Sequence, residues 1–356
     1  MTKPPRSWTT GLGLKTLAIL LLSTLLISCG SSKKFDEFIP SRIVSAGDGM
    51  SYLGTSSPYT NVLTVTQNEV NPNTTFDHWI KQFAFGYGLK TISNSLSSDA
   101  QIISLSTTLP VPGLHQPVPP SGFSLLKNIK EDQIDPAIAS GKIRTDDLLV
   151  LSVGLGDILD LSEKYLNNSD PATASAAYLI AEAKIRGQAY MDYANSLYES
   201  GAFKRIILVN PINIRNSPYA VNGDDNYRFG LKGQGGLIDQ MTEQFAYGLK
   251  SRASTYPRGG GVWLFDASNL VLNMNLVFAN INTSQPFCKA TPPVLETCTT
   301  LNTSDLSSLN SNVENYYKTN AAFPSYVFAG SLLPTPLVHQ YVGANLYNRM
   351  RSTIGF

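Results

Sequence analysis

Serine, histidine and acidic side chains are the groups of this chain that could carry out acyl transfer. That chemistry needs a nucleophile, a base that takes its proton, a group that orients the base, and donors aimed at the developing oxyanion. Only three histidines occur, and no serine or carboxylate spacing singles out His78 or His115 as a base. Asp48 and Asp157 lie in two glycine-rich segments, but two carboxylates without a base or a metal do not make an ester hydrolase.

Three segments of the chain combine apolar stretches with Gly, Asp, Pro, Thr and His residues in a characteristic order. Residues 42–54 and 147–158 each run from an apolar stretch into a Gly/Asp-containing turn, and residues 326–339 end in a Pro-Thr pair followed by a histidine. They resemble the sequence blocks of GDSL-type (SGNH) ester hydrolases, a lipase and esterase family, and the resemblance covers about residues 41–352. The matching framework residues are Gly47, Asp48, Gly54, Gly154, Asp157, Phe328, Ala329, Pro334, Thr335 and His339.

The resemblance implies that the reactive positions of the family have all changed. Residues 99–104 are similar to the family's Ala-Gln-Gly-Gly-Ala stretch, in which Ile102 and Ile103 replace both glycines. The reactive positions are taken by Gly49 (nucleophilic Ser), Ile102 (oxyanion-hole Gly), Gly156 (oxyanion-hole Asn), Gly330 (orienting Asp) and Leu333 (base His). Leu333 and Ile102 would make the former catalytic floor apolar.

Two residues could replace the missing groups. Ser51 lies two positions after Gly49, and we favour a hydroxyl at a helix start over a substitute nucleophile. His339 stands at the family's second, non-catalytic histidine, so we expect it to pack or hydrogen-bond in the last helix.

These replacements favour a pseudoenzyme that binds an acyl chain, a glycan or an envelope protein without hydrolysing it. The alternative is an active carboxyl-ester hydrolase that uses residues not identified in the sequence. A gene product that folds and does little is a third reading. Nothing in the pattern calls for a cofactor.

Short apolar runs at residues 42–46, 148–153, 205–209 and 262–265 predict strands buried on both faces, as in a parallel sheet. Apolar residues three and four apart predict helices between Asp170 and Gly201, over 237–249 and over 338–346. This order predicts a single α/β domain over 41–356, with a doubly wound, mostly parallel sheet between helices as in flavodoxin-like and SGNH folds. Long loops are expected near 106–125, 215–236 and 280–320.

The amino terminus reads as an export signal. Basic residues precede an apolar run over 17–27, which is too short to span a bilayer. The run ends in a sequence that resembles the lipobox of bacterial lipoproteins, where Cys29 would be acylated. We therefore expect a signal peptide over 1–28, a lipidated tether over 29–40, and anchoring in the bacterial envelope. Gly30, directly after this cysteine, is similar to the pattern of lipoproteins that are sorted to the outer membrane. The domain would then lie on the periplasmic or the outer face of that membrane.

Charge and cysteine content indicate which partners and which cross-links or metal sites to expect. The 27 basic and 26 acidic side chains give a net charge of +1, and no basic cluster indicates a nucleic-acid partner. In an oxidising compartment Cys288 and Cys298 most simply form a disulfide, the alternative being two free thiols. A metal site is not expected, because no histidine lies near either cysteine.

Overall fold

A computed structural model of the chain describes most of the predicted domain. The described residues are 39–51, 53, 64–65, 78–93, 96, 99–106, 125–144, 146–167, 172–221, 230–253, 261–288, 300–301, 307, 309–320, 325–330, 332 and 334–353. Pro40–Asn348 forms one compact unit. Of the other unit, Met1–Ile39 with Arg349–Phe356, the described part is Ile39 and the last residues of the final helix.

Parallel strands form the framework of the larger unit. The strands are β1 (Arg42–Gly47), β2 (Thr64–Val65), β3 (Ile92–Ser93), β4 (Ile102–Ser104), β5 (Asp147–Ser152), β6 (Arg205–Val209), β7 (Val262–Phe265) and β8 (Thr300–Leu301). Six of them make one sheet in the order β3-β4-β1-β5-β6-β7, and β2 pairs with β8. Inside the short edge strand β3, the order β4-β1-β5-β6-β7 is that of doubly wound, flavodoxin-like sheets. The expected α/β class is therefore confirmed.

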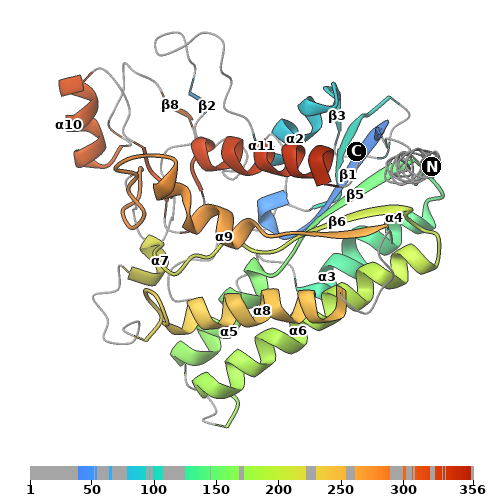
Figure 1. Cartoon of the computed structure of the whole chain (residues 1–356), viewed down its shortest axis with the longest axis horizontal. Coiled ribbons are helices and arrows are strands. Elements are labelled where there is room, and N and C mark those ends of the chain that lie inside the picture. The colour runs from blue at the N-terminus through green and yellow to red at the C-terminus, as the bar shows by residue number, and fades with distance from the viewer. Residues whose placement is uncertain are drawn as a thin grey trace, which may run out of the picture. The chain divides into compact units, whose positions relative to one another are not determined.

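Helices cover both faces of this sheet. They are α2 (Trp79–Gly86), α3 (Leu126–Asn128), α4 (Asp135–Ala139), α5 (Leu155–Asn167), α6 (Ala176–Glu199), α7 (Pro218–Val221), α8 (Leu237–Ala253), α9 (Ala267–Leu272), α10 (Ser311–Asn320) and α11 (Pro336–Thr353), with short turns η1 (Gly49–Ser51), η2 (Ile129–Ile134) and η4 (Met274–Leu276). Figure 1 shows α6 and α8 on one face and α2 and α11 on the other. This double cover explains why every residue of β1 and β5 is buried.

Small residues allow the closest helix contact, between α6 and α8. A Cβ added to Gly187 would lie 2.2 Å from the Phe245 carbonyl oxygen, and one added to Gly248 would lie 2.2 Å from that of Lys184. The two helices therefore pack backbone against backbone, which brings the buried rings of Tyr190 and Phe245 to a centroid distance of 5.6 Å. This packing supports the end of the sheet where β5 passes into α5.

The structure confirms the four predicted strands and corrects several boundaries. The predicted helix start at Asp170 lies outside the described residues, and α6 begins after Ser175, whose side chain accepts a bond from the Tyr178 amide. The buried stripe of α6 begins at Leu179 and not, as the sequence predicts, at Ile180. The expected loops at 215–236 and 280–320 contain α7 and α10, so they are not irregular throughout.

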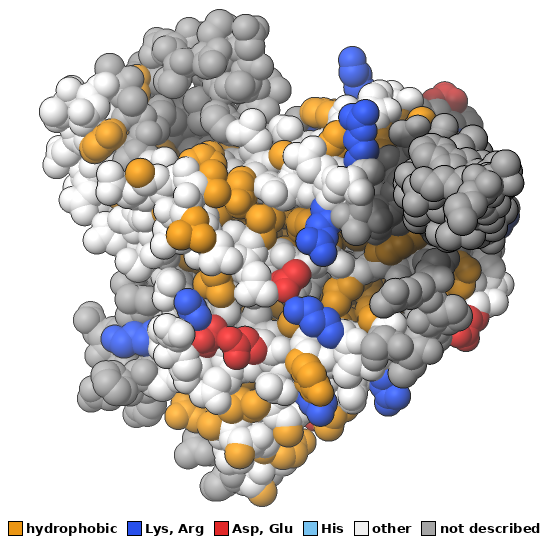
Figure 2. Space-filling view, in the orientation of Figure 1, with side chains coloured by type: hydrophobic (Ala, Val, Ile, Leu, Met, Phe, Trp, Pro, Cys, Tyr) orange, Lys and Arg blue, Asp and Glu red, His pale blue; other side chains and the backbone are white. Residues whose placement is uncertain are grey.

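The expectations for the amino terminus and the disulfide reach beyond the described residues. Cys29 and Cys298 both lie outside them, whereas Cys288 is fully buried and its amide donates to the Ala329 carbonyl at 2.7 Å. Lipidation at Cys29 and the pairing of Cys288 with Cys298 therefore stay predictions. Within the described part of the chain, no helix is long and apolar enough to cross a membrane. On the face shown in Figure 2, the Lys and Arg side chains of described residues are scattered among hydrophobic and acidic ones.

Candidate functional site

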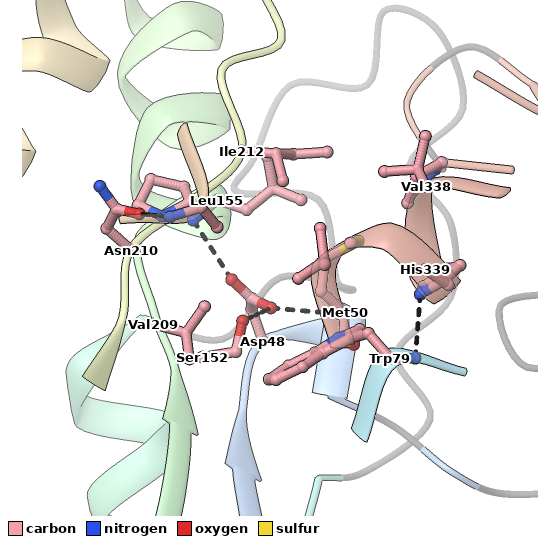
Figure 3. A pocket seen from close by; sticks show the side chains of 14 residues that line it. Asp48, Met50, Trp79, Ser152, Leu155, Val209, Asn210, Ile212, Val338 and His339 are labelled. Carbon is pink, nitrogen blue, oxygen red and sulfur yellow. Dashed lines mark hydrogen bonds between the residues drawn. The ribbon is translucent and has the colours of Figure 1, made fainter. Parts of the chain in front are cut away.

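A small pocket lies where the parallel strands end. Its walls come from the residues that follow β1, β5, β6 and β7, and from α2 and the first turns of α11 (Figure 3). Loops at the carboxyl ends of strands form the ligand crevice of open α/β sheets, at the point where the strand order reverses. Here β4 and β5 flank β1 on opposite sides, so the pocket next to β1 and β5 lies at that point. The cavity volume is about 20 Å³.

Asp48 is the acidic group of the pocket. Its Oδ1 accepts bonds from the Ser152 hydroxyl and the Met50 amide, both at 3.1 Å, and its Oδ2 accepts one from the Leu155 amide at 3.3 Å. Burial raises the pKa of this carboxyl to about 6, while these three hydrogen bonds lower it. A substantial fraction of Asp48 is therefore protonated in mildly acidic solution.

The turn after Asp48 is the place where the resemblance expects a nucleophile. Gly49 opens the turn η1, and Ser51, which ends it, carries the nearest hydroxyl. That hydroxyl is fully buried, donates to the Asp48 carbonyl at 2.7 Å and lies 2.8 Å from the Ser106 hydroxyl. Ser51 thus holds the short turn that it ends, instead of the helix start that the sequence suggested, and its oxygen does not face solvent.

Two histidines lie beside this turn, against each other. The rings of His78 and His339 are 4.8 Å apart and both are buried. His78 Nδ1 accepts a bond from the Ile80 amide at 3.3 Å, which caps α2. His339 Nδ1 lies 3.5 Å from the Trp79 amide, at the outer limit of a hydrogen bond. The Nδ1 atom of each ring is therefore directed at a backbone amide.

Burial keeps both rings neutral. It lowers the pKa of His339 to about 4 and holds the pKa of His78 well below its ordinary value, with His339 and Lys81 adding to the effect on His78. Among the described residues, the His339 side chain has no hydrogen bond to a hydroxyl or a carboxylate. This histidine packs and bonds in the last helix, as the sequence suggested.

Of the other expected catalytic positions, two lie near the strand ends. Gly156 is the second residue of α5, directly after the Leu155 amide that bonds Asp48. Gly330 is buried in the segment closed by the bridge between Phe328 and Pro334, and Pro334 lines the pocket. Leu333 lies outside the described residues, as does His115.

Ile102 requires a correction. It pairs with Ile43 in the middle of the sheet, two residues before the Ser45 to Ser104 pair and further still from Gly47, where β1 ends. Strand residues advance about 3.3 Å each, so the level of Ile102 lies about 13 Å before the end of β1 along the sheet. It therefore belongs to the core and cannot occupy an oxyanion position or line a catalytic floor. The same holds for Ile103, which pairs with Val44.

Ser106 lies beside the turn that follows β1, and the sequence analysis did not identify it as a site residue. It follows β4 by two positions and reaches Ser51, as described above. Other site residues that the sequence reasoning missed are Trp79, whose indole donates to the Met50 carbonyl at 2.7 Å, and Asn210. Asn210 accepts from the Ala267 amide at 2.6 Å and donates to Asp266 at 2.9 Å. Its position directly after a predicted strand was the available signal.

Asp157 lies outside the pocket lining and has a structural environment. Burial raises its pKa to about 6, an effect that the neighbouring Arg186 opposes at 3.1 Å. Arg186 also pairs with Asp160 at 2.7 Å and with Glu182 at 3.2 Å, so it joins α5 to α6. No group of three or more His, Cys, Asp or Glu side chains in the described ranges could hold a metal ion.

Comparisons with known proteins give no match in sequence and a distant similarity in structure. No family model and no curated protein matches the chain in sequence. A solved structure of a proposed arylesterase from Agrobacterium tumefaciens str. C58 is similar at 11% identity and a TM-score of 0.35, covering 87% of this chain and 98% of its own. At that level the similarity says nothing about activity, and the fold class rests on the observed strand order.

Proposed function

We propose that this chain is an envelope lipoprotein with an SGNH-hydrolase-like fold whose strand-end pocket binds a ligand without ester hydrolysis. The observation that supports this most is the turn after β1. It offers Gly49 at the expected nucleophile position and commits the Ser51 hydroxyl to the Asp48 carbonyl and Ser106. A serine hydrolase needs its hydroxyl hydrogen-bonded to a base, and here the histidines next to the turn bond to backbone amides.

The remaining framework is compatible with binding. Asp48, Ser152 and Leu155 form a bonded group at the bottom of the pocket, and the walls are mostly apolar. Apolar walls with few directed polar groups are typical of ligand sites, and a cavity of about 20 Å³ admits one small group of a ligand. Removing a triad leaves at most about 10³ to 10⁴-fold catalysis over water from the oxyanion hole and binding.

Hydrolysis of short and long acyl p-nitrophenyl esters by the full chain in detergent tests the proposal. We expect the rate of the heat-denatured control. Turnover well above it, abolished by an active-site fluorophosphonate, would show the alternative, an active ester hydrolase. A Ser51→Ala variant then tells whether that hydroxyl is responsible. A variant with Gly49→Ser, Gly156→Asn, Gly330→Asp and Leu333→His tests the matched positions, since a gain of turnover would support them.

The anchor and the disulfide belong to the same proposal. Acylation of Cys29 would tether the domain to the envelope, with the outer membrane favoured by Gly30, and an oxidised Cys288–Cys298 pair would suit that compartment. Mass spectrometry of the chain from bacterial membranes is the test. A diacylglyceryl-modified amino-terminal Cys29, lost in Cys29→Ser, is the expected result, whereas a soluble, unmodified chain would refute anchoring.

A further inference from the structure

Asp48 differs from the other buried aspartates in its electrostatic partners. Asp147, Asp157, Asp160 and Asp239 are each within 3.1 Å of an arginine side chain. Within the described part of the chain, Asp48 has no lysine or arginine partner. Its three hydrogen-bond donors, two amides and a hydroxyl, are neutral. A buried carboxylate without a counter-charge is costly, so a bound cation would be stabilised at this position.

The Asp48 carboxylate also has a hydrogen-bond acceptor site that no donor fills. An ionised carboxylate has about four acceptor sites, and three are filled. Ser152 donates to Asp48, and Asn210 is bonded to Asp266 and the Ala267 amide. The Trp79 indole donates to the Met50 carbonyl, and the Nδ1 atom of His339 faces the Trp79 amide. Figure 3 shows the Asp48 carboxyl projecting between the apolar side chains of Met50, Leu155 and Ile212. One positively charged donor with an apolar stem suits these surroundings.

The size of the cavity restricts that donor. A volume of about 20 Å³ exceeds the roughly 10–15 Å³ that one water needs by little. An ammonium group is close to water in size, whereas a trimethylammonium or a guanidinium group is much larger. We propose that the pocket binds the terminal ammonium group of an aliphatic primary amine, with the ammonium filling the cavity against Asp48 and the alkyl stem leading out of it along the apolar lining. This inference rests on the proposed binding function of the same pocket.

The charge of Asp48 should govern this binding. With the pKa of its carboxyl at about 6, Asp48 is mostly protonated at about pH 5 and mostly ionised at about pH 7.5. The two histidines and the tyrosine around it stay neutral over that range, because the pKa of His339 is about 4, that of His78 is lower than usual, and that of Tyr190 is well above its ordinary value. Asp157, which also neighbours Tyr190, has a pKa of about 6 as well, but unlike Asp48 it is paired with Arg186 at 3.1 Å. Lys81 is the cation near His78 that adds to the lowering of the His78 pKa. The affinity for an ammonium should therefore fall about tenfold from pH 7.5 to pH 5.

Ligand-observed NMR titration of the full chain in detergent with n-butylammonium tests the inference, with 1-butanol and butyltrimethylammonium as matched probes. We expect n-butylammonium to bind at least about tenfold more tightly than either probe at about pH 7.5, and about tenfold more weakly at about pH 5. Asp48→Asn should weaken it at least about tenfold, while Asp160→Asn should leave it unchanged.

Three results would overturn the inference: no binding of n-butylammonium, equal binding of the alcohol, or affinity that does not change with pH in the unmodified chain. The pH and probe comparisons use the unmodified protein, so they decide the matter even if Asp48→Asn does not fold. Ester turnover is measured separately. A failure of amine binding therefore leaves the hydrolysis result intact, and turnover would overturn the non-hydrolytic function without bearing on the amine.

Discussion

The side-chain amide of Gln133 binds both backbone polar groups of Gly47. The Gly47 amide donates to Gln133 Oε1 at 2.8 Å, and Gln133 Nε2 donates to the Gly47 carbonyl at 2.9 Å. Gln133 belongs to the π-helical turn η2, and Gly47 is the last residue of β1. A residue far along the chain thus completes the hydrogen bonding of the strand end that carries Asp48.

Replacing Gln133 by methionine should lower the free energy of unfolding by roughly 2–4 kcal/mol, because two buried backbone groups lose their partners. Urea unfolding followed by circular dichroism measures it. Gln240→Met is the matched control, since Gln240 also bonds a backbone carbonyl but is exposed. We expect a change within about 0.5 kcal/mol there. Equal losses in the two variants would contradict the role given to Gln133.

Gly47→Ala should be among the most damaging single changes in the domain. Gly47 has φ +123°, and an added Cβ would lie 1.9 Å from the Ser152 carbonyl oxygen, which belongs to the neighbouring strand. Gly201→Ala is the control, because Gly201 has φ +74° but nothing within 4 Å of its added Cβ. The control should lose about 1–2 kcal/mol from the backbone conformation alone. A loss for Gly47→Ala no larger than that would show that the strand ends can separate freely.

The ion pair of Arg42 and Asp147 supports the opposite end of the same two strands. Both side chains are almost fully buried, and Arg42 Nε donates to Asp147 Oδ1 at 2.6 Å. Arg42→Met should cost about 3–5 kcal/mol, because it leaves a buried carboxylate unpaired, and adding Asp147→Leu should recover part of that loss. Thermal unfolding in a double-mutant cycle provides the values. Lys318→Ala, which breaks the exposed pair with Glu314, should change stability by less than about 1 kcal/mol.

Asp48 should make the fold less stable as the pH rises. Its pKa is about 6 in the folded chain against 3.8 as the model value, so between those values the folded state holds the proton more tightly than the unfolded state. Its contribution therefore falls from pH 4 to pH 6, by up to roughly 3 kcal/mol, and is constant above. The difference in unfolding free energy between the unmodified chain and Asp48→Asn should follow this curve. A difference that stays flat or rises with pH would refute the burial of an uncompensated carboxyl.

Much of the fold could be predicted because its strands are unbroken apolar runs. The runs at β1, β5, β6 and β7 are long enough to indicate buried strands, and the stripes of α8 and α11 are regular. Strands β3 and β4 have two and three residues, so they give no periodic signal. Because β4 is so short, no strand pattern fixed the alignment of this segment. The match rested on two residues, Ala100 and Gln101, and it placed Ile102 at the oxyanion position several residues too early.

The site was harder to predict than the fold. Asp48 and His339 could be placed in sequence because glycines and a Pro-Thr pair flank them, yet the partners that define their chemistry come from distant segments. Trp79 reaches Met50 across 29 positions, and the Leu155 amide reaches Asp48 across 107. Such contacts depend on tertiary packing, which single-sequence patterns do not encode. That no lysine or arginine of the described residues pairs with Asp48 is likewise visible only in three dimensions.

Intact-mass spectrometry after treatment with a fluorophosphonate tests most directly whether the protein carries an activated serine. The reagent forms a covalent adduct with a serine only when a base activates the hydroxyl. Because Ser51 is buried and bonded to the Asp48 carbonyl and Ser106, we expect the full chain to keep its mass. A stoichiometric adduct on Ser51, or on any other serine, that is lost on heat denaturation would contradict it.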